Sequence, residues 1–97
     1  METKETIINK IRKNLPFLKS QYHIKEMSVF GSYVRNEQNA QSDIDILVEF
    51  DTSIGFFDFI KAENYLTELL GRKVDLVMKD VLKPRIGEVI LREMVLI

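Results

Sequence analysis

Residues 43–50, with the sequence DIDILVEF, place the strongest constraint on the fold of this 97-residue chain. Apolar, mostly β-branched residues alternate with acidic ones at the start of this run, which predicts a β-strand. Side chains on a strand repeat every two residues, so Asp43 and Asp45 should point the same way. Two carboxylates on one face repel each other and lose hydration, a cost that a bound cation would offset. We therefore expect a metal site here. Mg²⁺ is favoured because it takes a few carboxylate oxygens together with substrate phosphates.

A Gly-Ser pair lies upstream, with ten residues between Ser32 and Asp43. Gly31 follows an apolar run and lets the backbone turn sharply and approach a ligand closely. Ser32 is expected to cap a short helix that runs through Arg35, and the free N–H groups at such a helix start bind phosphate. Phosphate donors on one side and carboxylates on the other indicate a nucleotide-handling site.

A strand–helix–strand unit follows the acidic pair. Apolar residues recur at helical spacing and end at Gly71, a common helix terminator; they are Phe56, Phe57, Phe59, Ile60, Tyr65, Leu66, Leu69 and Leu70. The next strand, residues 73–78, should lie parallel to the first and beside it. Asp75 alternates with apolar neighbours on that strand. Either it joins Asp43 and Asp45 on one face, or it is a lone acid on an edge strand.

The remaining elements complete a small α/β (α+β) domain. An amphipathic helix is expected from about Thr3, and Pro16 should end or kink it. Residues 25–30 read as a strand, and Pro84 fits the start of a last helix. The apolar end, residues 94–97, either packs on its own core or meets another chain. These elements predict a three-stranded mixed sheet flanked by about four helices.

Composition bounds the remaining possibilities. We expect one domain over residues 1–97, too small to carry a separate substrate-binding lobe. With 14 basic and 15 acidic residues, no direct nucleic-acid binding is expected. The absence of cysteine excludes disulfides and fits a cytoplasmic protein. No apolar run is long enough to span a bilayer, so no membrane association is expected.

The pattern Gly31-Ser32, ten residues, Asp43-x-Asp45 resembles the signature of the minimal nucleotidyltransferases in the DNA polymerase beta-like superfamily. The resemblance covers nearly the whole chain and extends through Arg35, Ser42 and residues 74–77 and 90–93. One departure is Asn36, where the family usually has Gly. Asn is the next best residue in a left-handed conformation, so we expect little effect.

The resemblance implies a polymerase beta palm-like fold and a two-metal mechanism. In that mechanism Asp43 and Asp45 hold two Mg²⁺ ions, and Asp75 holds the one that activates the attacking hydroxyl. Gly31 and Ser32 would hold the β and γ phosphates of a nucleoside triphosphate, with ATP as the expected substrate. For Arg35 two roles are open, a phosphate contact or an ion pair with an acid.

The family also suggests a partner. Stand-alone members resemble the antitoxins of two-gene modules, in which AMP is added to a tyrosine of a helical HEPN-type ribonuclease toxin. This implies a protein adenylyltransferase that acts as an antitoxin. Two alternatives are a binding module that silences its partner without catalysis, and a small-molecule nucleotidyltransferase whose acceptor site lies at the seam of a homo-oligomer.

Overall fold

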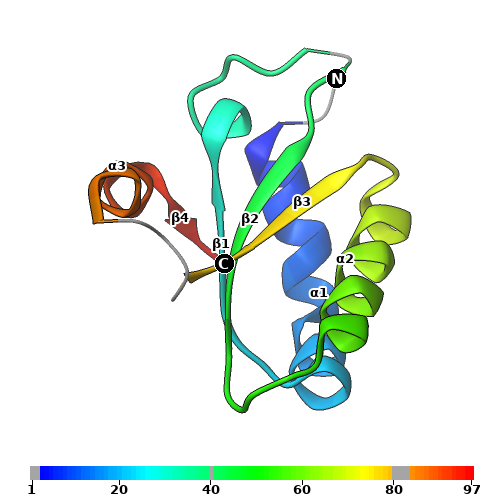
Figure 1. The fold of residues 1–97 in the computed structure, drawn as a ribbon. Helices are drawn as coiled ribbons and strands as arrows, with labels where there is room; N and C mark the ends of the chain where they lie inside the picture. Colours follow the sequence, from blue (N-terminus) through cyan, green and yellow to red (C-terminus); the bar gives the residue numbers. More distant parts are fainter. Residues whose placement is uncertain (1–2, 40, 80–83) are drawn as a thin grey trace.

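A computed structural model describes residues 3–39, 41–79 and 84–97 of the chain. Its elements in chain order are α1 (Lys4–Tyr22), β1 (Ile24–Phe30), the 3₁₀ helix η1 (Gly31–Tyr33), β2 (Ile44–Phe50), α2 (Phe56–Leu70), β3 (Val74–Met78), α3 (Pro84–Glu93) and β4 (Val95–Leu96) (Figure 1). The predicted fold class, a mixed sheet with flanking helices, is confirmed.

The sheet has the strand order β3-β2-β1-β4. β2 and β3 are parallel and neighbouring, as the crossover through α2 predicts, whereas β1 is antiparallel to β2 and to β4. The prediction of three strands is wrong, because the apolar C-terminus adds a short fourth strand. It pairs Val95 with Val29, and Ile97 N–H donates to the Met27 carbonyl at 2.9 Å. A two-residue strand carries too little alternation to be recognised in the sequence.

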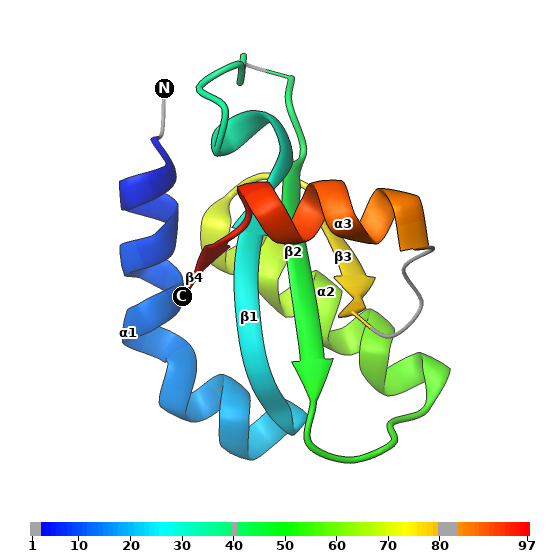
Figure 2. The ribbon, with the colours of Figure 1, turned by 90° about the vertical axis from the view of Figure 1, so that its left-hand side faces the viewer.

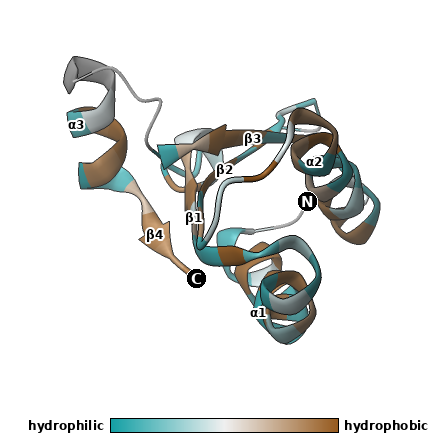
Figure 3. Cartoon of the chain, turned by 60° about the horizontal axis from the view of Figure 1, so that its bottom comes forward, coloured by the Kyte–Doolittle hydropathy of each residue, from teal (hydrophilic) through white to brown (hydrophobic). Residues whose placement is uncertain are grey.

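The two faces of the sheet are covered unequally. Figures 1 and 2 show α1 and α2 on one face and α3 crossing the other, and Figure 3 shows the same arrangement from another side. Ile44, Ile46 and Val48 alternate along β2 into the main core with α1 and α2. On the opposite face, Phe30 and Leu47 pack with Ile90 of α3 in a smaller cluster. About four helices were predicted, and the described residues form three α-helices and η1.

The helix ends agree with the sequence in part. Thr3 caps α1, since its Oγ1 accepts a hydrogen bond from Thr6 N–H at 3.4 Å. The helix continues past Pro16 to Tyr22, so the proline does not end it; Figure 2 shows that α1 bends along its length. α2 ends at the left-handed Gly71 (φ 69°), as predicted.

The first turn of α2 differs from the prediction. Phe56 and Phe57 are 71% and 78% exposed, although both belong to the predicted apolar stripe. At about 100° per residue, Phe57 lies on the side of the helix opposite the buried Leu66. Among the described residues, no helix is both long and apolar enough to cross a membrane.

Candidate functional site

Two of the three candidate acids lie opposite each other on β2 and its edge-strand neighbour β3. The parallel register places Asp45 of β2 directly opposite Asp75 of β3, and the antiparallel register places it opposite Phe30 of β1. Directly opposed residues share a face of the sheet. Because Phe30 packs with Ile90, this is the face that α3 covers in part. Asp75 therefore shares a face of the sheet with Asp45, although β3 is an edge strand, and Asp43 precedes the paired residues of β2.

The negative charges around Asp45 are only partly balanced by positive charge. Burial, the negative charge of Asp75 and that of Asp43 raise the pKa of Asp45 to about 6, whereas the positive charge of Arg35 lowers it. Within the parts of the chain described here, no three acidic, His or Cys side chains are grouped tightly enough to hold a metal ion as they stand. Carboxylate oxygens whose charges repel are nevertheless the donors that a hard divalent cation takes. The donor type fits Mg²⁺.

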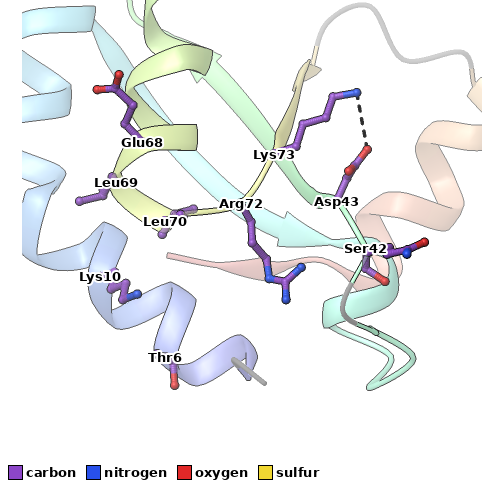
Figure 4. A pocket seen from close by; sticks show the side chains of 11 residues that line it. Thr6, Lys10, Ser42, Asp43, Glu68, Leu69, Leu70, Arg72 and Lys73 are labelled. Carbon is purple, nitrogen blue, oxygen red and sulfur yellow. Dashed lines mark ion pairs between the residues drawn. The ribbon is translucent and has the colours of Figure 1, made fainter.

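Asp43 lies immediately before β2 and pairs with a lysine. Its Oδ2 lies 3.8 Å from Lys73 Nζ; the lysine side chain is 76% exposed and that of Asp43 is 45% exposed, so the pair contributes little to stability (Figure 4). Asp43 also borders a hollow of about 1030 Å³. Thr6 and Lys10 of α1, the end of α2 and the turn before β3 form its other walls. Asp43 can therefore be reached from the side of the sheet that carries α1 and α2.

Gly31 lies against the carboxylate of Asp45. Its φ of +81° is a left-handed conformation, and a Cβ added there would overlap Asp45 Oδ2 and lie 3.1 Å from Asp45 Cγ. The close approach that the sequence predicts at Gly31 is thus an approach to a site carboxylate. A side chain at this position would displace that carboxylate.

The turn that follows differs from the prediction in its cap. Ser32 does not cap the short helix: the N-cap position is Phe30, which makes no side-chain cap hydrogen bond. Instead, Val34 N–H and Arg35 N–H both donate to the Gly31 carbonyl, at 3.1 and 3.2 Å. Asn36 has a φ of 58°, so the expected left-handed conformation is confirmed. Backbone hydrogen bonds to the Gly31 carbonyl therefore take the place of the expected serine cap.

Arg35 pairs with acids, which is one of the two roles left open by the sequence. Its Nε donates to Glu37 Oε1 at 2.9 Å, and its Nη1 donates to both Glu93 oxygens at 3.0 and 3.1 Å. The hydrogen bond to Glu93 is the main reason that the pKa of Arg35 is raised. Glu93 Oε1 also accepts from Gly31 N–H at 3.1 Å.

Glu93 is the residue that the sequence analysis missed. The resemblance includes residues 90–93 but gives Glu93 no role. Its contact with Gly31 spans 62 positions of the chain. A local pattern cannot reveal such a contact, because only the tertiary structure brings the end of α3 to the turn.

Comparisons with known proteins identify the family of this chain. A family model described as a nucleotidyltransferase domain matches residues 8–97. The protein adenylyltransferase MntA of Thermococcus cleftensis is 44% identical over 95 residues, which are 98% of this chain and 93% of the relative.

Solved structures share the fold. One described as a candidate minimal nucleotidyltransferase superposes with a TM-score of 0.80 at 33% identity, covering 97% of this chain and 95% of that one. A second is the complex of the tri-AMPylated HEPN toxin of Shewanella oneidensis with its MNT antitoxin. The match has a TM-score of 0.60 at 22% identity, and covers 95% of this chain and 66% of that one. At that identity the likeness shows the fold alone.

Proposed function

This chain belongs to the nucleotidyltransferase domain family, and we propose that it transfers a nucleoside monophosphate from a nucleoside triphosphate, with ATP as the donor, to a hydroxyl group. The observation that carries the proposal is the register of Asp45 opposite Asp75, with Gly31 packed against Asp45. In this arrangement the turn that would bind phosphate lies beside Asp45, at one end of the β2–β3 pair.

Each candidate residue then has a role. Asp43, Asp45 and Asp75 would hold two Mg²⁺ ions, which supply charge stabilisation for an in-line displacement at phosphorus. Gly31 and Ser32 would bind the β and γ phosphates. The requirement for Mg²⁺ is part of the proposal and is supported by the poorly compensated charge at Asp45.

The reaction balances as a simple substitution. The acceptor oxygen forms a bond to the α phosphorus, the bond from that phosphorus to the bridging oxygen breaks, and pyrophosphate leaves. The hydroxyl proton passes to a carboxylate, for which Asp75 is the candidate because it is the exposed acid of the pair.

For the acceptor we propose a tyrosine hydroxyl on a HEPN-type toxin, so that this chain acts as an antitoxin. The 44% identical relative is named a protein adenylyltransferase, which supports a protein acceptor. The toxin partner is suggested by a protein of the same fold, the MNT antitoxin of an AMPylated HEPN toxin, and the tyrosine comes from the family resemblance.

The decisive experiment follows α-phosphate label from each of the four nucleoside triphosphates, with Mg²⁺, onto the protein encoded beside this gene. We expect label from ATP on that protein. Asp45→Asn should reduce the rate at least about a hundredfold, on the order of 2.7 kcal/mol of barrier, because it removes a shared metal ligand. Asp43→Asn should have a similar effect.

A matched control is Asp51→Asn, the same substitution immediately after the other end of β2. The Asp51 side chain is 53% exposed and lies 4.0 Å from His23, far along the strand from the proposed site. It should leave the rate within about twofold of the wild type. Normal turnover by a folded Asp45→Asn variant would contradict the two-metal proposal.

A binding module without catalysis is less well supported. The bare apolar C-terminus suggested this hypothesis, but Val95 and Ile97 pack against the main core. The triple change of Asp43, Asp45 and Asp75 to Asn separates the two functions. A triple variant that still protects cells from the toxin would show that binding suffices.

A further inference from the structure

We infer that Glu93 is a positioning residue for the nucleotide site: its single carboxylate holds Gly31 and Arg35 together and so fixes the turn of residues 31–33 against Asp45. The contacts are Gly31 N–H to Oε1 at 3.1 Å, and Arg35 Nη1 to Oε1 and Oε2 at 3.0 and 3.1 Å. The Glu93 side chain is only 21% exposed. This role rests on the proposed function for its catalytic consequence, but the geometry is independent of that function.

Gly31 is held from two sides. Its Cα faces the Asp45 carboxylate with no room for a Cβ, and its N–H is bound by Glu93. A hydrogen bond to an ionised carboxylate is stronger than one between neutral groups. Any shift of the Gly31 backbone would move the proposed phosphate-binding turn relative to Asp45, the proposed metal ligand beside it. Glu93 is the described side chain that prevents this shift.

The backbone of Glu93 is itself fixed. α3 ends at Glu93, and β4 begins two residues later. β4 pairs with β1 at Val29, close to the end of the strand that leads into Gly31. The carboxylate therefore links the end of α3 to the first residue of η1, so a shift of α3 would also move the turn.

The negative charge of Glu93 strengthens its hold on Arg35 but also repels the carboxylate of Asp45. The charge of Glu93 opposes ionisation of Asp45, whereas that of Arg35 favours it. A neutral glutamine could accept the Gly31 hydrogen bond without repelling Asp45. The carboxylate adds the two-oxygen ion pair with Arg35, which orients both side chains. Glu37, the second acid on Arg35, makes no such link to Gly31 among the described contacts.

Three variants test the inference. Glu93→Ala removes both contacts, Glu93→Gln keeps an acceptor for Gly31 N–H but loses the charge, and Glu37→Gln removes only the other acid on Arg35. Hydrogen exchange of the Gly31 amide is measured by NMR on the nucleotide-free full-length chain. Binding of an ATP analogue with an uncleavable α–β bridge, kcat and KM are measured on the same variants.

In Glu93→Ala we expect Gly31 amide exchange to be at least about tenfold faster and kcat/KM at least about tenfold lower, with weaker analogue binding. Glu93→Gln should recover part of each loss, because it restores one hydrogen bond. Glu37→Gln should stay within about twofold of the wild type in all three measurements. Thermal unfolding curves identify any variant that has lost its fold, and Glu93→Gln then carries the test.

Several outcomes would overturn the role. Unchanged Gly31 exchange in Glu93→Ala would show that the hydrogen bond does not hold the turn. Tighter analogue binding by Glu93→Ala would show that Glu93 competes with phosphate instead of supporting its site. If Glu37→Gln lost as much as Glu93→Ala in these measurements, the losses would come from the ion pairing of Arg35 and not from the hydrogen bond to Gly31. If the wild type transfers no label, the proposed function fails, while amide exchange and analogue binding still decide the role of Glu93.

Discussion

The two faces of β2 show how one strand serves stability and chemistry separately. On the face toward α1 and α2, Ile44, Ile46 and Val48 are at most 1% exposed and belong to the main core. On the face toward α3, burial and the neighbouring charges of Asp75 and Asp43 raise the pKa of Asp45 to about 6. The first face supplies the free energy that keeps the second in an unfavourable arrangement. Sites of this kind are where proteins accept a loss of stability for function.

The largest effect should come from breaking the core face. Ile46 is fully buried, and Ile46→Ala leaves a cavity beneath the sheet. We expect a loss of about 3 kcal/mol in the free energy of unfolding, measured by urea denaturation. Ile46→Val, which removes one methylene, should cost about 1 kcal/mol. A loss below that of the valine variant would mean that this face does not carry the stability of the strand.

A smaller loss of stability with a larger loss of activity is expected at Gly31. Gly31→Ala requires a left-handed alanine, which costs about 1–2 kcal/mol of stability. The new Cβ also pushes against Asp45 Oδ2, so the carboxylate must move. Label transfer should therefore fall by more than about tenfold while the protein remains folded. Gly71→Ala is the control, since Gly71 is also left-handed but has no atoms of this kind near its Cβ position. It should show a similar loss of stability with activity retained.

Removing the negative charge of Asp45 should stabilise the folded chain. The folded-state pKa of Asp45, about 6, lies above the ordinary 3.8, so the folded chain binds this proton more tightly than the unfolded chain. The ionised carboxylate therefore destabilises the folded chain above pH 6, and this destabilisation decreases as the pH falls through the folded-state pKa. Because Asp45 is only half-buried, we expect Asp45→Asn to gain about 1 kcal/mol in metal-free buffer near neutral pH.

Thermal unfolding at several pH values measures this gain. The difference between Asp45→Asn and the wild type should shrink from about pH 7.5 to about pH 5, because the wild-type carboxyl becomes neutral over that range. Added Mg²⁺ should raise the melting temperature of the wild type and have less effect on the variant. Glu26→Gln, an exposed acid on β1, should show neither trend. A pH-independent difference would contradict the repulsion described for this face.

The strands of the sheet differ in how far the sequence predicts them. Alternation along residues 43–50 is enough to predict β2, and the length of the α2 crossover predicts its parallel neighbour. The pairing of Asp45 with Asp75 was left open, because a parallel neighbour does not by itself fix the register of the two strands. Periodicity is a local property, so the short β4 strand, whose partner lies far upstream in the chain, could not be recognised.

The turn at Gly31 was predicted from its residues, but its supports were not. Ser32 was expected to cap the helix because serine is a common cap, whereas backbone carbonyl bonding closes the turn. Glu93 approaches Gly31 only through the packing of α3 and the pairing of β4 with β1. Contacts of this kind depend on tertiary structure, and spacing in the sequence carries no trace of them.

The smallest effect should be found where the apolar pattern and the burial disagree. Phe57 and Leu66 were both assigned to the buried stripe of α2, yet Phe57 is 78% exposed and Leu66 is fully buried. Phe57→Ser should change the free energy of unfolding by less than about 0.5 kcal/mol, the usual range for surface positions. Leu66→Ala on the same helix should cost about 3 kcal/mol, so urea denaturation of the two variants separates the exposed side from the packed one. A comparable loss at Phe57 would mean that the first turn of α2 is buried in solution, and that the sequence pattern describes this helix better than the exposed fractions do.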